Sequence, residues 1–89
     1  MDNQDIKLLL VKTLQLKKAY ITGDSNHINI IAIGDIFKSA TQVQRQQIVY
    51  RPLINMITEK YIHAVSIMSY TPEEWEKNNK KNNSNHLLK

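Results

Sequence analysis

Residues 18–37 read KAYITGDSNHINIIAIGDIF, and this stretch decides the predicted fold. Residues 18–22 are typical of a short strand, and residues 23–26 (Gly, Asp, Ser, Asn) are typical of a turn. Residues 27–33, with four isoleucines, are typical of a second strand that Gly34 and Asp35 end. The stretch therefore predicts an antiparallel hairpin, followed by a loop that contains Phe37.

A helix is expected before the hairpin, over residues 3–15. Asp2 or Asn3 can cap it, because both side chains accept hydrogen bonds from the first turn of a helix. Five residues recur at the spacing of one helix face: Ile6, Leu9, Leu10, Thr13 and Leu14. This apolar stripe predicts that the helix packs on the hairpin.

After the loop, Thr41 followed by Gln44 forms a capping box that predicts the start of a second helix. Pro52 lacks a backbone donor, so this helix is expected either to kink or to divide into two shorter helices. Residues 62–70 are typical of a third strand. A helical crossover between the second and third strands favours a parallel pair with a right-handed connection.

The segment Thr71, Pro72, Glu74 predicts a short final helix, with threonine as the cap, proline at the first helical position and the glutamate at the third to complete a capping box. The predicted order is helix, strand, strand, helix, strand, helix, in the α+β class. It makes a three-stranded mixed sheet with helices on one face. Residues 1–78 are expected to form a single domain, and residues 79–89 a disordered basic tail.

The charge and composition exclude several classes of protein. The 89 residues carry a net charge of +4, with 12 basic and 8 acidic residues. Four lysines lie in the last thirteen residues, so the remaining chain has eight basic (12 minus 4) against eight acidic residues. With no cysteine, the chain can form no disulfide and no thiolate metal site of its own. It lacks an apolar run of about 18 residues and a basic leader, so a cytoplasmic protein without a membrane segment is expected.

Two histidines are the candidate metal ligands. His27 opens the second predicted strand and His63 lies at the start of the third. If these strands are adjacent and parallel, both histidines lie at one end of the sheet on strands roughly 4.8 Å apart, so their imidazoles could converge on one metal. Two histidines leave a four-coordinate site incomplete, so a partner would supply the other ligands. Alternatively, His63 packs at the edge of the core and His27 is an ordinary polar residue after a turn.

The sequence contains no recognisable catalytic motif, and an enzyme is not expected. Nucleic-acid binding is the alternative, because a small sheet with helices on one face also describes KH modules. Those modules use a Gly-x-x-Gly loop, whereas Gly34 is followed by Asp35 and has no second glycine. Arg45, Arg51 and Lys60 on the middle helix would be the contact residues, or simply a solvated helix face.

Four stretches resemble the BolA family: HINIIAIGDIF at 27–37, RQQIVY at 45–50, IHAVSI at 62–67 and YTPEEW at 70–75. QQIVYRPL at 46–53 and TGD at 22–24 are most similar to the IbaG (YrbA) branch. The resemblance implies a KH-like fold and a partnership with a monothiol glutaredoxin of the Cys-Gly-Phe-Ser type. The resemblance also implies, as the alternative, DNA binding and transcriptional control.

By this resemblance, the chain would share a [2Fe-2S] cluster with glutaredoxin and glutathione. The partner and glutathione would give thiolates, and this chain would give His63 and His27. Phe37, in an exposed loop, and Tyr70 and Trp75 could form the docking surface, or could pack in or beside the core. Without its partner the protein is expected to hold no cofactor and to be a monomer or a weak homodimer.

Overall fold

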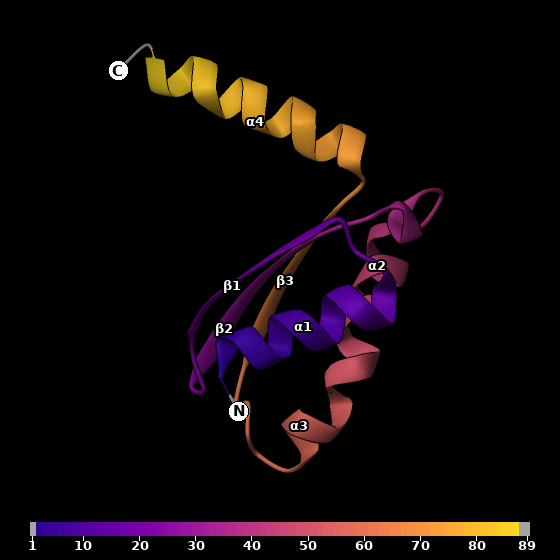
Figure 1. Cartoon of the computed structure of the whole chain (residues 1–89), viewed down its shortest axis with the longest axis vertical. Coiled ribbons are helices and arrows are strands. Elements are labelled where there is room, and N and C mark those ends of the chain that lie inside the picture. Colours follow the sequence, from indigo (N-terminus) through magenta and orange to yellow (C-terminus); the bar gives the residue numbers. More distant parts are fainter. Residues whose placement is uncertain (1, 88–89) are drawn as a thin grey trace.

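The computed structural model describes the backbone of residues 2–87 and the side chains of residues 2–79. The chain runs helix, strand, strand, helix, strand, helix, with short 3₁₀ segments between some of them (Figure 1). The elements are α1 (Asn3–Leu14), β1 (Lys18–Asp24), β2 (His27–Ile33), η1 (Asp35–Phe37), α2 (Gln42–Tyr50), η2 (Arg51–Leu53), α3 (Ile54–Thr58), β3 (Val65–Tyr70) and α4 (Pro72–Leu87). This order confirms the predicted α+β class.

The three strands form one mixed sheet in the order β1-β2-β3. β1 and β2 are antiparallel, with Lys18 opposite Ile33 and Asp24 opposite His27. β2 and β3 are parallel, with Ile28 opposite Val65. The crossover through α2 and α3 makes this parallel pairing possible, because parallel strands need a long connection.

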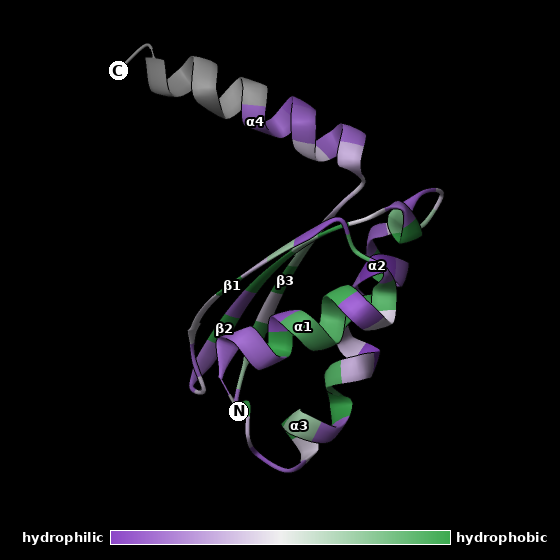
Figure 2. Ribbon diagram, in the orientation of Figure 1, coloured by the Kyte–Doolittle hydropathy of each residue, from purple (hydrophilic) through white to green (hydrophobic). Residues whose placement is uncertain are grey.

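The core lies between one face of the sheet and the helices α1, α2 and α3. α1 contributes Ile6, Leu10 and Leu14, all buried, and the sheet contributes Ile28, Ile30 and Ala32 among others. Figure 2 shows apolar residues on α1 and on the segment from α2 to α3, whereas the described part of α4 is mostly hydrophilic. Each apolar side chain that is fully buried contributes roughly 1.5–3 kcal/mol of stability, so this layer holds the domain together.

The second face of the sheet is here called the open face, because α1, α2 and α3 do not cover it. Alternation along the strands puts every second residue on this face. Its residues are Lys18, Tyr20 and Thr22 on β1, His27, Asn29, Ile31 and Ile33 on β2, and Ser66, Met68 and Tyr70 on β3. The open face therefore carries one of the two candidate histidines.

The helix boundaries follow the capping signals. Asp2 caps α1 and forms a capping box with Asp5. Thr41 and Gln44 form the predicted box at the start of α2. Pro52 lies in η2, which separates α2 from α3, so the alternative of two shorter helices is confirmed.

The third strand is shorter than predicted. It begins at Val65, whereas the sequence pattern places its start at residue 62. Ile62 is buried in the core, and the backbone N–H of His63 donates to the carbonyl of Ser25 at 2.8 Å. Residues 62–64 thus connect α3 to the sheet and are held by the hairpin turn before regular pairing begins.

The final helix leaves the end of β3 and extends away from the sheet (Figure 1). It is longer than the short helix predicted, since it runs to Leu87 and passes residue 78, where the predicted domain ends. The side chains from residue 80 onward and residues 88–89 lie outside the described part. The expected disorder of residues 79–89 stays a prediction.

Candidate functional site

The parallel register brings the start of β2 beside the chain that leads into β3. Ile28 is opposite Val65, and the N–H of Ile28 donates to the carbonyl of Ala64 at 2.9 Å. Extending this register by one residue makes Ala64 the lateral neighbour of His27. His63 is the next residue back along the chain, so the two histidines lie at the same end of the sheet.

His27 lies on the open face and is exposed. Its Nε2 is 2.8 Å from the hydroxyl oxygen of Ser66 on the neighbouring strand β3. The hairpin turn also holds its backbone, since the carboxylate of Asp24 accepts from the N–H groups of Asn26 at 3.0 Å and His27 at 3.4 Å. The ring is thus held in place while its other nitrogen makes no hydrogen bond among the described residues.

His63 is exposed as well, but it does not belong to β3. The prediction that it opens the third strand is therefore wrong, and alternation along that strand does not set the direction of its side chain. Its backbone is tied to Ser25 in the hairpin turn. Within the described residues, its imidazole makes no hydrogen bond or ion pair, so it is free to turn toward a partner.

The described residues do not form a complete metal site. No group of three or more His, Cys, Asp or Glu side chains among them is arranged to hold a metal ion. The donor set at this end of the sheet consists of two accessible imidazoles, a ligand type that suits iron, zinc and copper. A metal group held by these histidines would take its remaining ligands from another molecule.

The candidate docking residues lie elsewhere. Phe37 was expected in an exposed loop, but its side chain is completely buried in the core, so that expectation is wrong. It belongs to the same hydrophobic core cluster as Ile30, Val49 and Leu53. A residue with no exposed surface has no direct contact to offer a partner.

Tyr70 and Trp75 form an aromatic cluster on the open face. The Trp75 ring centroid is 5.2 Å from that of Tyr70 and 5.8 Å from that of Tyr20. Tyr70 ends β3, on the order of 13 Å along the strand from Ser66, and Trp75 lies beyond it on α4. The structure therefore does not bring them together with His27, and their contact role stays a prediction.

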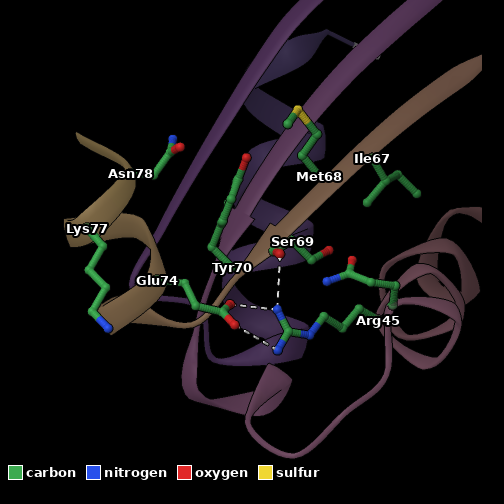
Figure 3. A pocket seen from close by; sticks show the side chains of 9 residues that line it. Arg45, Ile67, Met68, Ser69, Tyr70, Glu74, Lys77 and Asn78 are labelled. Atoms are coloured by element: carbon green, nitrogen blue, oxygen red, sulfur yellow. Dashed lines mark hydrogen bonds and ion pairs between the residues drawn. The ribbon is translucent and has the colours of Figure 1, made fainter. Parts of the chain in front are cut away.

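The candidate nucleic-acid residues do not form one basic face. Arg45 is buried, and its guanidinium donates to both carboxylate oxygens of Glu74, at 2.6 and 3.3 Å (Figure 3). It also donates to the carbonyl oxygens of Ala40 and Ser69. The prediction that Arg45 lies on a solvated face or contacts phosphate is wrong, because the side chain is buried and donates four hydrogen bonds within the protein.

Arg51 and Lys60 are exposed, but they belong to different elements. Arg51 opens η2, whereas Lys60 follows α3 in a turn with φ of 65°. Lys60 is thus not on the middle helix as predicted. The two cations do not continue a stripe that starts at Arg45.

A hollow of about 480 Å³ lies beside the Arg45–Glu74 pair, between α2, β3 and α4 (Figure 3). Its lining residues are Gln42, Arg45, Ile67, Met68, Ser69, Tyr70, Glu74, Lys77 and Asn78. The pKa of the Glu74 carboxyl lies below its ordinary value. The largest cause is the hydrogen bond from Arg45, and the next is the hydrogen bond from the backbone N–H of Thr71. The two charged groups at the border of the hollow, Arg45 and Glu74, therefore already neutralise each other.

Two features of the site were missed at the level of sequence. The partnership of Arg45 with Glu74 has no local signal, because 28 residues separate the two positions along the chain. Ser66 had a weak signal, since its alternation with Met68 places it on the same face as His27 once β2 and β3 are adjacent and parallel. The capping role of Glu74 toward Thr71 was predicted and is confirmed.

A family model described as BolA-like protein matches residues 10–74, which include both candidate histidines. The chain belongs to the BolA family. Within the described part of this BolA-family protein, no helix has the length and apolar character needed to cross a bilayer.

Relatives and solved structures agree with this assignment. An uncharacterized protein of Buchnera aphidicola subsp. Acyrthosiphon pisum is 75% identical over 80 residues, which cover 90% of this chain and 100% of that protein. The acid stress protein IbaG of Escherichia coli is 42% identical over 82 residues, or 92% of this chain and 98% of IbaG. This similarity confirms the predicted IbaG-like branch.

The fold comparison includes BolA1 from Arabidopsis thaliana. That structure superposes with a TM-score of 0.72 at 26% identity, over 81% of this chain and 93% of BolA1. The arrangement of the three strands and their helices in this protein is therefore the BolA fold.

Proposed function

We propose that this BolA-family protein is a non-enzymatic partner of a monothiol glutaredoxin and acts in the cytoplasm. In the shared complex, His63 and His27 would be ligands to a [2Fe-2S] cluster. The cysteine of glutaredoxin and glutathione would provide the thiolates. The role would belong to iron-sulfur trafficking or iron homeostasis.

The observation that carries this proposal is the position of two accessible histidines at the same end of the sheet. His27 starts β2, and His63 is one residue before Ala64, the lateral neighbour of His27. Neither imidazole is buried, so both are open to a second protein. An ordinary core histidine would be covered, and neither of these is.

The donor set fits a shared cluster better than a site held by this chain alone. The chain has no cysteine, and thiolates are the usual ligands of iron-sulfur clusters. Imidazole replaces thiolate at some iron positions in mixed-ligand clusters. The bound cluster would supply iron as the acceptor of the imidazole lone pairs, and the protein would supply the two imidazoles, of which the His27 ring is already held by Ser66.

Nucleic-acid binding has less support as the main function. Of its three candidate contact residues, Arg45 is buried against Glu74, and Arg51 and Lys60 lie on separate elements. Loss of one of the three cations removes an electrostatic contact on which backbone binding depends. The four lysines at residues 77 to 89 are the remaining excess of positive charge.

The proposal is tested by visible circular dichroism of a cluster-bearing monothiol glutaredoxin titrated with this protein. We expect a new spectrum that saturates at one protein per glutaredoxin. His63→Ala should abolish it and His27→Ala should weaken or alter it. Thr22→Ala is the matched control, because Thr22 is also exposed and polar on the open face but carries no imidazole.

An unchanged spectrum with the wild-type protein would rule out cluster ligation. A spectrum that persists in both histidine variants would rule out these ligands while leaving the partnership. A triple Ala variant of Lys77, Lys80 and Lys81 distinguishes cluster ligation from nucleic-acid binding. It removes basic side chains but no histidine, so it should leave the cluster spectrum unchanged. Loss of the spectrum in that variant would contradict the proposed site.

A further inference from the structure

A hydrogen bond between neighbouring strands involves one of the candidate ligands directly. The Nε2 atom of His27 lies 2.8 Å from the Oγ atom of Ser66. Both side chains are on the open face, and Ser66 lies two residues along β3 from Ala64, the lateral neighbour of His27. Two regular, hydrogen-bonded strands therefore fix the positions from which the two side chains meet.

The contact distinguishes the two nitrogens of the ring. A neutral imidazole carries one N–H and one lone pair, and a metal ligand must use the lone pair. Nε2 is engaged with Ser66, whereas no described group makes a hydrogen bond to Nδ1. If Nε2–H donates to the hydroxyl oxygen, the lone pair lies on Nδ1, which is then the nitrogen available to bind a metal ion.

We infer that Ser66 is a positioning residue for His27. Its hydroxyl accepts from Nε2–H, stabilises the tautomer with the lone pair on Nδ1, and leaves Nδ1 as the ring nitrogen with no hydrogen bond among the described residues. This inference rests on the proposed function for the identity of the group that Nδ1 meets. The tautomer itself is a property of the protein alone.

The bond suits a ligand histidine for a general reason. In metal proteins the nitrogen that does not bind metal usually donates its N–H to an oxygen acceptor, which fixes the tautomer and the ring orientation. Ser66 is already in that position in the chain without a partner. The opposite direction, with the serine hydroxyl donating to Nε2, would place the proton on Nδ1 and leave neither nitrogen available.

The tautomer can be measured on the isolated protein by ¹H–¹⁵N correlation of the imidazole nitrogens at about pH 9, where histidine is neutral. We expect His27 to carry its proton on Nε2. Ser66→Ala should shift the tautomer ratio by about two- to tenfold toward that of a free imidazole, the range expected for one exposed hydrogen bond. Ser66→Thr retains the hydroxyl and should restore the wild-type ratio.

Two internal controls come from the chain itself. His63 has no hydrogen bond to its ring among the described residues, so its ratio should not change in either Ser66 variant. Thr22→Ala changes another polar residue of the open face and should leave His27 unaffected. A proton on Nδ1 of wild-type His27, an unchanged ratio in Ser66→Ala, or failure of Ser66→Thr to restore it would overturn the inference.

The consequence for ligation is measured in the same circular dichroism titration. Ser66→Ala should raise the concentration for half-saturation about two- to tenfold with the same final spectrum, and Ser66→Thr should restore it. If His27→Ala alters the spectrum but Ser66→Ala leaves the titration unchanged, the positioning role is wrong and the proposed function survives. If the tautomer result holds but no cluster spectrum forms, the proposed function fails instead.

Discussion

Arg45 on α2 and Glu74 on α4 form a paired ionic contact that joins the middle of the chain to its last helix. The distances from the guanidinium to the two carboxylate oxygens are 2.6 and 3.3 Å. The Arg45 side chain is 8% exposed and that of Glu74 is 46% exposed. The arginine is thus the buried partner, and the half-exposed glutamate balances its charge from the solvent side.

Removing the carboxylate should destabilise the domain. Glu74→Ala would leave the Arg45 guanidinium buried with only two carbonyl acceptors, and we expect a loss of about 1–3 kcal/mol in the free energy of unfolding. Urea unfolding followed by circular dichroism measures it. Glu73→Ala is the control, because Glu73 meets Lys38 in an exposed pair, and little change is expected there. Equal stabilities of the two variants would contradict the structural role of the Arg45–Glu74 pair.

The same pair should make stability depend on acid. The pKa of Glu74 is lowered by its hydrogen bond from Arg45 and by that from the Thr71 backbone. A carboxyl with a lowered pKa in the folded state contributes its full stability above its unfolded pKa of about 4.5 and loses it as pH falls through the lower, folded value. The stability difference between wild type and Glu74→Gln should therefore be constant near neutral pH and shrink below about pH 4.5. Urea unfolding of both proteins across this range tests it; a difference that grows with acid would contradict the assignment.

Acid should also release the shared cluster if histidines are its ligands. Protonation removes the imidazole lone pair, so bleaching of the complex should accelerate as the solution is made more acidic. The decay of visible absorbance measures the rate. A glutaredoxin homodimer that holds its cluster without histidine is the reference, and an identical pH profile for the two would argue against imidazole ligation.

Phe37 provides a test of core packing against docking. Its side chain is fully buried, so Phe37→Ala should cost about 3–5 kcal/mol of unfolding free energy, and Phe37→Leu less. Thermal unfolding measures both variants. At a temperature where Phe37→Leu remains folded, its titration with glutaredoxin should match that of wild type. Weakened binding without loss of stability would instead assign Phe37 a contact role.

Much of the fold was predictable because its signals are local. The turn predicted at residues 23–26 lies in the observed hairpin. It is shorter than predicted, because β1 continues through Asp24 and only Ser25 and Asn26 form the turn. The caps at Thr41 and Thr71 were recognised because their side chains accept hydrogen bonds from nearby backbone groups. The break near Pro52 was recognised because proline has no backbone N–H to donate. Each of these effects acts within about one turn of the chain, so a single sequence reveals it.

The candidate site was predictable only in part. The sequence predicted that His27 and His63 lie at the same end of two adjacent parallel strands, and the observed register confirms that for their backbones. It did not predict that β3 begins after His63. Strand alternation therefore sets the face of His27, but it does not set the face of His63.

The sequence by itself determined the order of elements, the parallel crossover and the lack of any thiol ligand. These follow from hydrophobic periodicity, capping chemistry and composition, which need no knowledge of distant contacts. Only the tertiary structure decided that Phe37 is buried, that Arg45 pairs with Glu74, and that Ser66 meets His27. Each of these depends on side chains far apart in sequence, and their energies exist only after the sheet and its helices have packed.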